Sequence, residues 1–268
     1  KAKIINVKVN NKNLRYKLSE TFSKNLIGQK IVNITRRSKY LIFHFKKKKL
    51  LSHLGMSGKL LLFKEKSNTL LRTSFYYDLN ILPQHNHIYF FLNNNLTIIY
   101  NDVRRFGFFK IFNNIELNQI PFLKKLGLEP FNKKFHLEYF KNFVKSRKKN
   151  IKNLLMDQTF VSGLGNIYVN EALFISKIHP LRKCNNLKKK EIIILISNIK
   201  KILRDSISKG GSSIKDFINS RGKSGNFQQY FRVYDKENKN CSRNSCRGLI
   251  KKIWISKRSS FYCSNCQK

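Results

Sequence analysis

The chain has 268 residues, of which 41% are hydrophobic, and no apolar run approaches the roughly 18 residues that a membrane span needs. Its 55 Lys and Arg residues outnumber its 14 Asp and Glu residues, which gives a formal net charge of +41. This composition excludes a transmembrane chain and favours a soluble protein of about two domains with a polyanionic partner, nucleic acid first of all.

The N-terminal part of the chain is expected to form short β-strands. Runs rich in Ile, Phe, Tyr and Leu alternate with turns of Asn, Lys or Gly, a pattern that predicts an antiparallel sandwich or a barrel-like domain. The polar stretch 65–86 interrupts the series and is expected to be a long surface loop. The predicted strands are residues 4–9, 30–34, 40–45, 50–54, 59–63, 87–92, 96–100 and 108–112.

A helical part is predicted after a linker between Pro121 and Pro130. A glycine-containing turn is followed by a predicted helix over 166–176, and a longer helix is predicted over 188–208, ended by two glycines. A short helix over 212–219 is expected next. From residue 134 onward, the apolar residues follow the spacing of an amphipathic helix, at Phe140, Phe143, Val144, Ile151, Leu154 and Leu155.

The cysteines indicate a metal site. Two close pairs joined by a hairpin, with strands expected over 249–255 and 259–262, can place four thiolates around one zinc ion. Free or disulfide-linked cysteines are the alternative, and they would leave a tail with almost no core of its own. Cys184 is expected to be an ordinary thiol. The four residues expected to bind zinc lie in the last 28 residues, at Cys241, Cys246, Cys263 and Cys266.

The sequence around the four cysteines is also specific enough to indicate a family. The segments 246–250 (CRGLI) and 258–267 (RSSFYCSNCQ) resemble the C-terminal zinc-finger signature of the formamidopyrimidine-DNA glycosylase family. Further blocks resemble the same family in the same order, so the resemblance covers essentially the whole chain. These blocks are 36–41 (RRSKYL), 53–58 (HLGMSG), 101–107 (NDVRRFG), 126–130 (LGLEP), 155–158 (LMDQ), 163–168 (GLGNIY) and 210–212 (GGS).

The resemblance implies an α+β multidomain protein. Its expected parts are an N-terminal antiparallel β-sandwich (1–118), a helix-two-turn-helix DNA-binding domain (130–225) and a zinc-ribbon finger (238–268). The implied activity is that of a base-excision-repair DNA glycosylase and AP lyase, which removes 8-oxoguanine and formamidopyrimidines from duplex DNA and cleaves the strand by β,δ-elimination. Zinc is the implied cofactor and double-stranded DNA containing oxidised bases the partner. A cytoplasmic monomer without membrane association is expected.

The resemblance assigns roles to individual residues. A base inside a duplex must be extruded before it is excised, and the gap must be filled. The residues that fill this gap in the family, here called the wedge, match Met56, Arg104 and Phe106. Met56 can intercalate, Phe106 can stack, and Arg104 can hydrogen-bond to the base left without a partner. From sequence alone, core packing is the ordinary role of Met56 and Phe106. Lys39 and Arg258 match catalytic positions in strand cleavage, and Arg258 is also expected to grip the lesion phosphate.

Other polar positions are expected to contact the DNA backbone. Asn166 lies where the glycine turn enters a helix, a place where backbone N–H groups can bind a phosphate, and Glu171 is expected to orient this site. The neighbouring His87 leaves the register of the phosphate-contacting histidine open. The residues expected to bind DNA are His85, Arg104, Arg147, Lys152 and Asn166.

One departure from the family concerns the N-terminus. The family's nucleophile is the amine of an N-terminal proline followed by glutamate, whereas this sequence begins where the first core strand is expected. We therefore expect an N-terminally incomplete sequence of an active enzyme. The alternatives are a shortened protein that binds lesions without cutting, an endonuclease VIII-like glycosylase for oxidised pyrimidines, and a non-catalytic zinc-ribbon DNA-binding protein.

Overall fold

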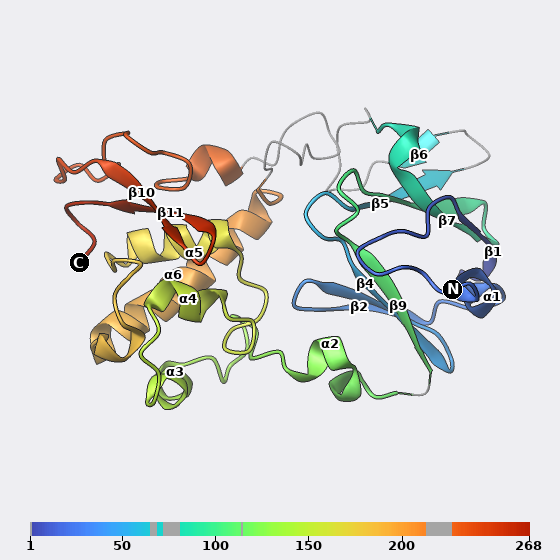
Figure 1. Ribbon diagram of the computed structural model, residues 1–268, viewed down its shortest axis with the longest axis horizontal. Helices are drawn as coiled ribbons and strands as arrows, with labels where there is room; N and C mark the ends of the chain where they lie inside the picture. Colours follow the sequence, from blue (N-terminus) through green and yellow to red (C-terminus); the bar gives the residue numbers. More distant parts are fainter. Residues whose placement is uncertain (1, 65–68, 72–80, 114, 213–226) are drawn as a thin grey trace. The chain divides into compact units, whose positions relative to one another are not determined.

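The computed structural model describes residues 2–64, 69–71, 81–113, 115–212 and 227–268 (Figure 1). The chain forms two compact units, one built from the described residues up to Lys124 and the other from Lys125–Gly211 and Phe227–Lys268. Each unit has its own hydrophobic core. The helix expected over 212–219 lies outside the described residues except for Ser212.

The first unit is a sandwich of two antiparallel sheets. One sheet has five strands in the order β1-β7-β8-β5-β6, and the other has four in the order β2-β3-β4-β9. The strands are β1 (Ile4–Val9), β2 (Asn33–Arg37), β3 (Tyr40–His44), β4 (Lys48–His53), β5 (Lys59–Lys64), β6 (Thr69–Leu71), β7 (Asn86–Leu92), β8 (Leu96–Asn101) and β9 (Phe108–Asn113).

The sandwich core lies between the inner faces of the two sheets. Ile88 and Phe90 of the five-stranded sheet belong to the same buried cluster as Phe43, Leu50 and Phe109 of the four-stranded sheet. Their alternation with less buried residues explains why the period-two pattern predicted these strands within one or two residues. The expected α+β fold class, with an N-terminal antiparallel sandwich, is therefore confirmed.

Three short elements differ from the sequence expectation. The strand expected over 30–34 begins only at Asn33, because Ile31 instead donates its backbone N–H to the Ala2 carbonyl. Helix α1 (Phe22–Leu26) was not predicted, since five residues are too few for a helical period to emerge. The stretch 65–86 is not a single loop, because it contains β6 and the 3-10 helix η2 (Pro83–His85). The other elements of this unit are η3 (Leu117–Gln119) and α2 (Pro121–Lys124).

The second unit is mainly helical. The amphipathic spacing between Phe140 and Leu155 is divided between two short helices, and the Asn150 side chain caps the second by accepting the Asn153 N–H at 2.8 Å. The long helix ends at Ser208 and is followed by Gly210 and Gly211, which both have positive φ. The elements are α3 (Leu137–Val144), α4 (Ile151–Met156), α5 (Asn166–Ile175), η4 (Cys184–Asn186), α6 (Lys189–Ser208) and η5 (Phe227–Tyr230).

The C-terminal hairpin packs on α5. Strand β10 (Ile250–Ile255) pairs with β11 (Arg258–Cys263) in one continuous antiparallel register. Phe174 of α5 shares a buried cluster with Phe261 of β11. The hairpin is therefore part of the same compact unit as the helices.

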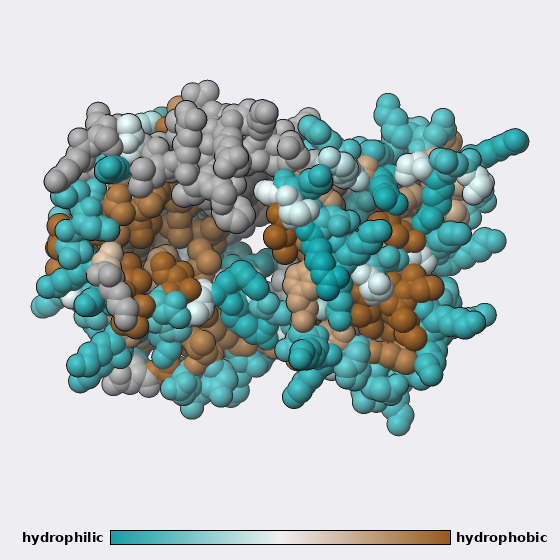
Figure 2. All heavy atoms as spheres, turned by 180° about the vertical axis from the view of Figure 1, so that it is seen from behind, coloured by the Kyte–Doolittle hydropathy of each residue, from teal (hydrophilic) through white to brown (hydrophobic). Residues whose placement is uncertain are grey.

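The surface carries most of the charge. Hydrophilic side chains dominate the face shown in Figure 2, with apolar patches between them on each unit. Among the described residues, no helix combines the length and apolar character needed to span a membrane.

Candidate functional site

Two turns of the first unit present large apolar side chains to solvent. Met56, between β4 and β5, is 47% exposed, and Phe106, between β8 and β9, is 44% exposed. The Arg104 guanidinium carbon lies 4.5 Å from the centroid of the Phe106 ring. The turns are in close contact, because a Cβ on Gly55 would lie 2.6 Å from the Gly107 nitrogen. The expected wedge residues are thus exposed rather than packed in the core.

Lys39 lies in the tight turn between β2 and β3, beside His53 at the end of β4. Burial lowers the pKa of His53, and the charges of Lys39 and Arg15 lower it further. The Nδ1 atom of His53 accepts the Gly55 N–H at 3.0 Å. His53, which the sequence did not single out, therefore holds the turn that carries Met56.

The two candidate histidines differ in environment. His87 is 4% exposed, and its Nε2 lies 2.8 Å from the Asp102 carbonyl oxygen, so it belongs to the core of the sandwich. His85 is partly exposed at the end of η2. Its side chain is thus accessible to a ligand, in keeping with the choice of His85 over His87.

In the second unit, two of the expected DNA-binding residues, Lys152 and Asn166, meet at Ser259 of β11, next to Arg258. Lys152 of α4 donates through Nζ to the Ser259 carbonyl at 2.8 Å and to the Ser260 hydroxyl at 2.6 Å. Asn166 of α5 donates to the same Ser259 carbonyl at 3.0 Å. Both side chains therefore hold the backbone next to the exposed Arg258.

A cavity of about 390 Å³ lies between α4 and this turn. Lys152 is 1% exposed, and burial, followed by the charge of Arg258, lowers its pKa to about 7. A small cationic cavity of this kind suits an anion such as a phosphate. The lining residues are Lys149, Lys152, Asn153, Met156, Asp157, Ile255, Ser256 and Arg258.

Arg147 does not line this cavity. Its guanidinium carbon lies 3.9 Å from the Phe143 ring centroid, and its Nη1 donates to the Phe143 carbonyl. The side chain therefore covers the end of α3.

Buried polar groups of α5 attach the chain segments around the hairpin. The carboxylate of Glu171, 2% exposed, accepts the backbone N–H groups of Arg232, Val233 and Tyr234 at 2.9–3.0 Å. Burial raises its pKa, and these three hydrogen bonds oppose the rise. Asn170 accepts the Phe261 N–H at 2.8 Å. Glu171 thus positions residues 232–234, which precede the cysteine hairpin. The expectation was that it would orient the glycine turn 163–165.

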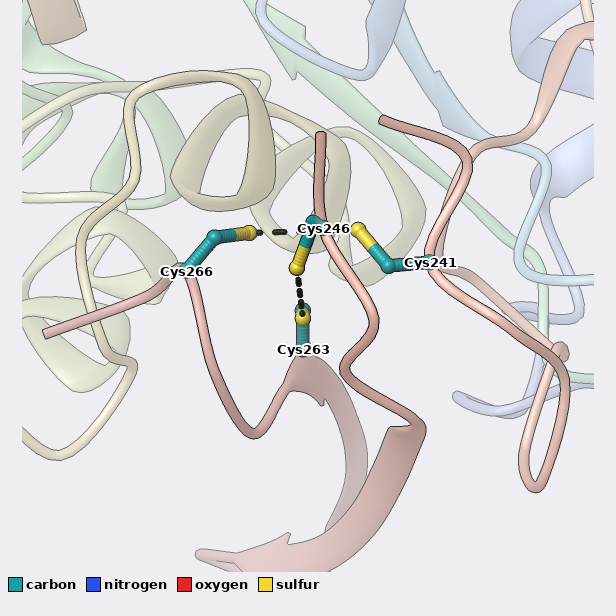
Figure 3. Close-up of side chains that lie close together, drawn as sticks. All are labelled: Cys241, Cys246, Cys263 and Cys266. Carbon is teal, nitrogen blue, oxygen red and sulfur yellow. Dashed lines mark hydrogen bonds between the residues drawn. The ribbon is translucent and has the colours of Figure 1, made fainter. Parts of the chain in front are cut away.

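The four predicted cysteines converge at the base of the hairpin (Figure 3). The Sγ atoms of Cys241 and Cys266 are 3.9 Å apart, and those of Cys246 and Cys263 are 3.5 Å apart. Four sulfurs around a tetrahedral zinc ion lie about 3.8 Å apart, so the arrangement fits such an ion. Burial, followed by the neighbouring thiols, raises the pKa of Cys266.

Comparison with known proteins identifies the family. Residues 1–109 match the formamidopyrimidine-DNA glycosylase N-terminal domain, and residues 126–218 match the formamidopyrimidine-DNA glycosylase H2TH domain. The chain belongs to the formamidopyrimidine-DNA glycosylase family. It is therefore a DNA glycosylase of base-excision repair, and neither the endonuclease VIII-like nor the non-catalytic alternative is favoured.

The similarity extends over nearly the full length of the relatives. The formamidopyrimidine-DNA glycosylase of Bartonella tribocorum is 41% identical and aligns over 100% of this chain and 93% of its own length. That of Rickettsia conorii is 40% identical over 98% and 91%. A Lactococcus lactis FPG mutant in complex with Fapy-dG containing DNA has a TM-score of 0.83 and 33% identity over 100% of this chain and 93% of its own. A complex of Lactococcus lactis Fpg with abasic-site DNA has a TM-score of 0.82 and 34% identity, with the same coverage.

Within this glycosylase, sequence reasoning found the exposed residues more readily than the buried ones. His53, Asp102 and Asn170 were not predicted as site residues, although His53 and Asp102 hold turns that carry expected ones and Asn170 holds the strand that begins with Arg258. Asp102 and His53 lie inside recognised blocks, so their position next to glycine turns was the available signal.

Proposed function

We propose that this protein removes oxidised purines, 8-oxoguanine and formamidopyrimidines, from double-stranded DNA and then cleaves the strand by β,δ-elimination. The observation that carries the proposal is the group of Met56, Arg104 and Phe106, which is exposed on two turns in mutual contact. Exposed apolar side chains next to a guanidinium are suited to entering a base stack.

In this proposal, the wedge stabilises the extruded state. Met56 and Phe106 replace the stacking that the extruded nucleotide loses, a loss of a few kcal/mol. Arg104 offers N–H donors to the base left without a partner. Insertion is easiest where pairing is already weakened, which favours damaged sites.

The β10–β11 turn grips the backbone at the lesion. Arg258 presents its guanidinium to a phosphate, while Lys152 and Asn166 fix the turn through the Ser259 carbonyl. His85 and Arg147 provide further backbone contacts. Lys39, in the turn beside His53, assists strand cleavage. The attack on the sugar itself is assigned to none of these residues.

The four cysteines hold one structural zinc ion. Zinc fits the all-sulfur ligand set and the sulfur spacing, and it neutralises thiolates that otherwise repel each other. When bound, the ion supplies no chemistry to the reaction but keeps the hairpin folded. We further propose that the protein acts as a monomer in the cytoplasm.

An excision and strand-cleavage assay of the protein tests the proposal. Its substrates are duplexes that contain 8-oxoguanine, a formamidopyrimidine or an oxidised pyrimidine. The third duplex is included because one relative, Lactococcus lactis Fpg, was solved with oxidised-pyrimidine DNA (TM-score 0.81, 33% identity). We expect excision and strand cleavage at both purine lesions. Faster release of the pyrimidine would assign the protein to the pyrimidine branch, and tight binding without excision would make it a lesion-binding protein.

A further inference from the structure

We propose that Asp102 is a positioning residue for the two wedge turns, the turn that carries Met56 and the turn that carries Arg104 and Phe106. By holding these turns in one arrangement, Asp102 sets how strongly the protein prefers lesions to intact DNA. This inference rests on the proposed function, because it concerns the wedge of Met56, Arg104 and Phe106. Asp102 itself is 0% exposed and cannot touch DNA.

Three donors converge on the carboxylate of Asp102 from different elements. Its Oδ1 accepts the Ser57 hydroxyl at 2.5 Å. Its Oδ2 accepts the Tyr100 hydroxyl at 2.7 Å and the Gly107 N–H at 2.9 Å. An ionised carboxylate is an acceptor only, so it satisfies all three donors at once. The carboxylate therefore joins β8 to both wedge turns.

The Ser57 hydroxyl completes the link between the turns. It donates to Asp102 and also accepts the Arg104 N–H at 3.0 Å. Each wedge residue is thus within one residue of this network, since Met56 precedes Ser57 and Phe106 precedes Gly107. Movement of one turn must disturb hydrogen bonds that hold the other.

The backbone around the network is unfavourable without such support. Arg105, between two wedge residues, has a φ of 55°, in the left-handed region that costs energy for a side chain other than glycine. The Gly107 amide and the Asp102 carbonyl, which accepts the Arg105 N–H at 3.3 Å, hold this turn closed. A wedge fixed before binding loses little conformational freedom on insertion, so its affinity for a lesion is higher.

The test compares the affinity for a duplex with a tetrahydrofuran abasic analogue and for the same duplex undamaged. In Asp102→Asn, an amide N–H₂ must face a donor, so we expect abasic-site affinity to fall about tenfold, the effect of one lost charge-assisted hydrogen bond. Affinity for undamaged duplex and its salt dependence should be unchanged, because the phosphate contacts remain. Ser57→Ala leaves Tyr100 and Gly107 on the carboxylate but removes the hydroxyl that links Asp102 to the Arg104 N–H, so it should also lower abasic-site affinity, and it serves if Asp102→Asn does not fold.

A double-mutant cycle separates positioning from general destabilisation. If Asp102 acts through the wedge, the loss in the double variant Asp102→Asn/Phe106→Ala should be smaller than the sum of the two single losses. With Ser57→Ala in its place, the same non-additivity is expected. Fully additive losses, or unchanged lesion preference in a folded variant, would overturn the inference. A wild-type protein without preference for the abasic duplex would instead overturn the proposed function.

Discussion

The amine of Lys152 is almost completely buried. Its pKa falls to about 7 because burial disfavours the charged form and Arg258 adds repulsion. Its hydrogen bonds to Ser259 and Ser260 do not require the charge, since a neutral amine also donates. Folding therefore removes the Lys152 amine from water, which lowers its pKa, and the amine then holds the hairpin through two hydrogen bonds.

The stability of the protein should record this exchange as a dependence on pH. Between about 7 and the ordinary lysine value of 10.5, the unfolded chain binds a proton at Lys152 that the folded chain does not, so stability should rise with pH in this window. Lys152→Met should reduce the slope by at most about 1.4 kcal/mol per pH unit. Urea unfolding at pH 7 and pH 9 measures it. Lys149→Met, at a half-exposed lysine, is the control, and equal slopes for wild type and Lys152→Met would contradict the assignment.

The Phe106 ring should contribute to lesion binding but hardly to folding. Phe106→Ala removes a ring that is 44% exposed and stacked under Arg104, so folding should be nearly unaffected. Affinity for an 8-oxoguanine duplex should fall about tenfold or more, given an aromatic stacking contribution of about 1–3 kcal/mol. Ile34→Ala, at a position 50% exposed on β2, is the matched control. Equal losses in the two variants, measured by titration, would show that no wedge exists at Phe106.

At the scale of elements, the β10–β11 hairpin depends on contacts at both ends. Side chains of α4 and α5 hold β11, through the Ser259 carbonyl and the Phe261 N–H. The cysteine cluster closes its base, where Gly248 allows close approach: a Cβ there would lie 2.7 Å from the Cys263 sulfur. Loss of either support should release the turn that carries Arg258.

Zinc removal should therefore abolish DNA binding before it unfolds the sandwich. We expect one zinc ion per chain by metal analysis, and loss of both metal and duplex affinity in Cys266→Ser. Cys184→Ser, at the buried thiol outside the cluster, should retain both. Full DNA affinity in metal-free protein would show that the hairpin does not need the ion.

Arg258 is expected to contribute one phosphate contact. Arg258→Ala should flatten the dependence of log affinity on log salt by about one unit, whereas Lys24→Ala on α1 should leave it unchanged. Trp254, the only tryptophan, is 70% exposed and pairs with Ser259 across the hairpin, so its fluorescence can follow duplex binding. An unchanged slope would remove Arg258 from the phosphate contacts.

At the scale of the whole molecule, the net charge of +41 overstates the DNA contacts. Lysines are spread over many surfaces, and some have structural partners, as Lys48 does with Asn25 and Lys49 with the Ile115 carbonyl. If four to six groups contact phosphates, log affinity for undamaged duplex should fall with log salt at a slope of about −4 to −5. A slope several times steeper, measured by titration between low and physiological salt, would mean that binding follows total charge instead.

The sequence by itself determined the fold class, most strands, the long helix and the cluster of four cysteines that could hold a metal ion. These features follow from the local periodicity and spacing of residues along the chain. Examples are the alternation of buried and less buried residues in β7 and the two close cysteine pairs. It also marked the exposed wedge through the resemblance of short blocks around Met56 and Phe106.

Only the tertiary structure decided which polar groups hold these residues in place. Asp102 meets Ser57 across 45 residues, and Lys152 meets Ser260 across 108, and no local pattern encodes such pairs. Tertiary packing also buried Lys152, an amine that looks solvated in the sequence. The physical reason is that burial and hydrogen-bond partners depend on which distant segments meet, whereas periodicity depends only on neighbours along the chain.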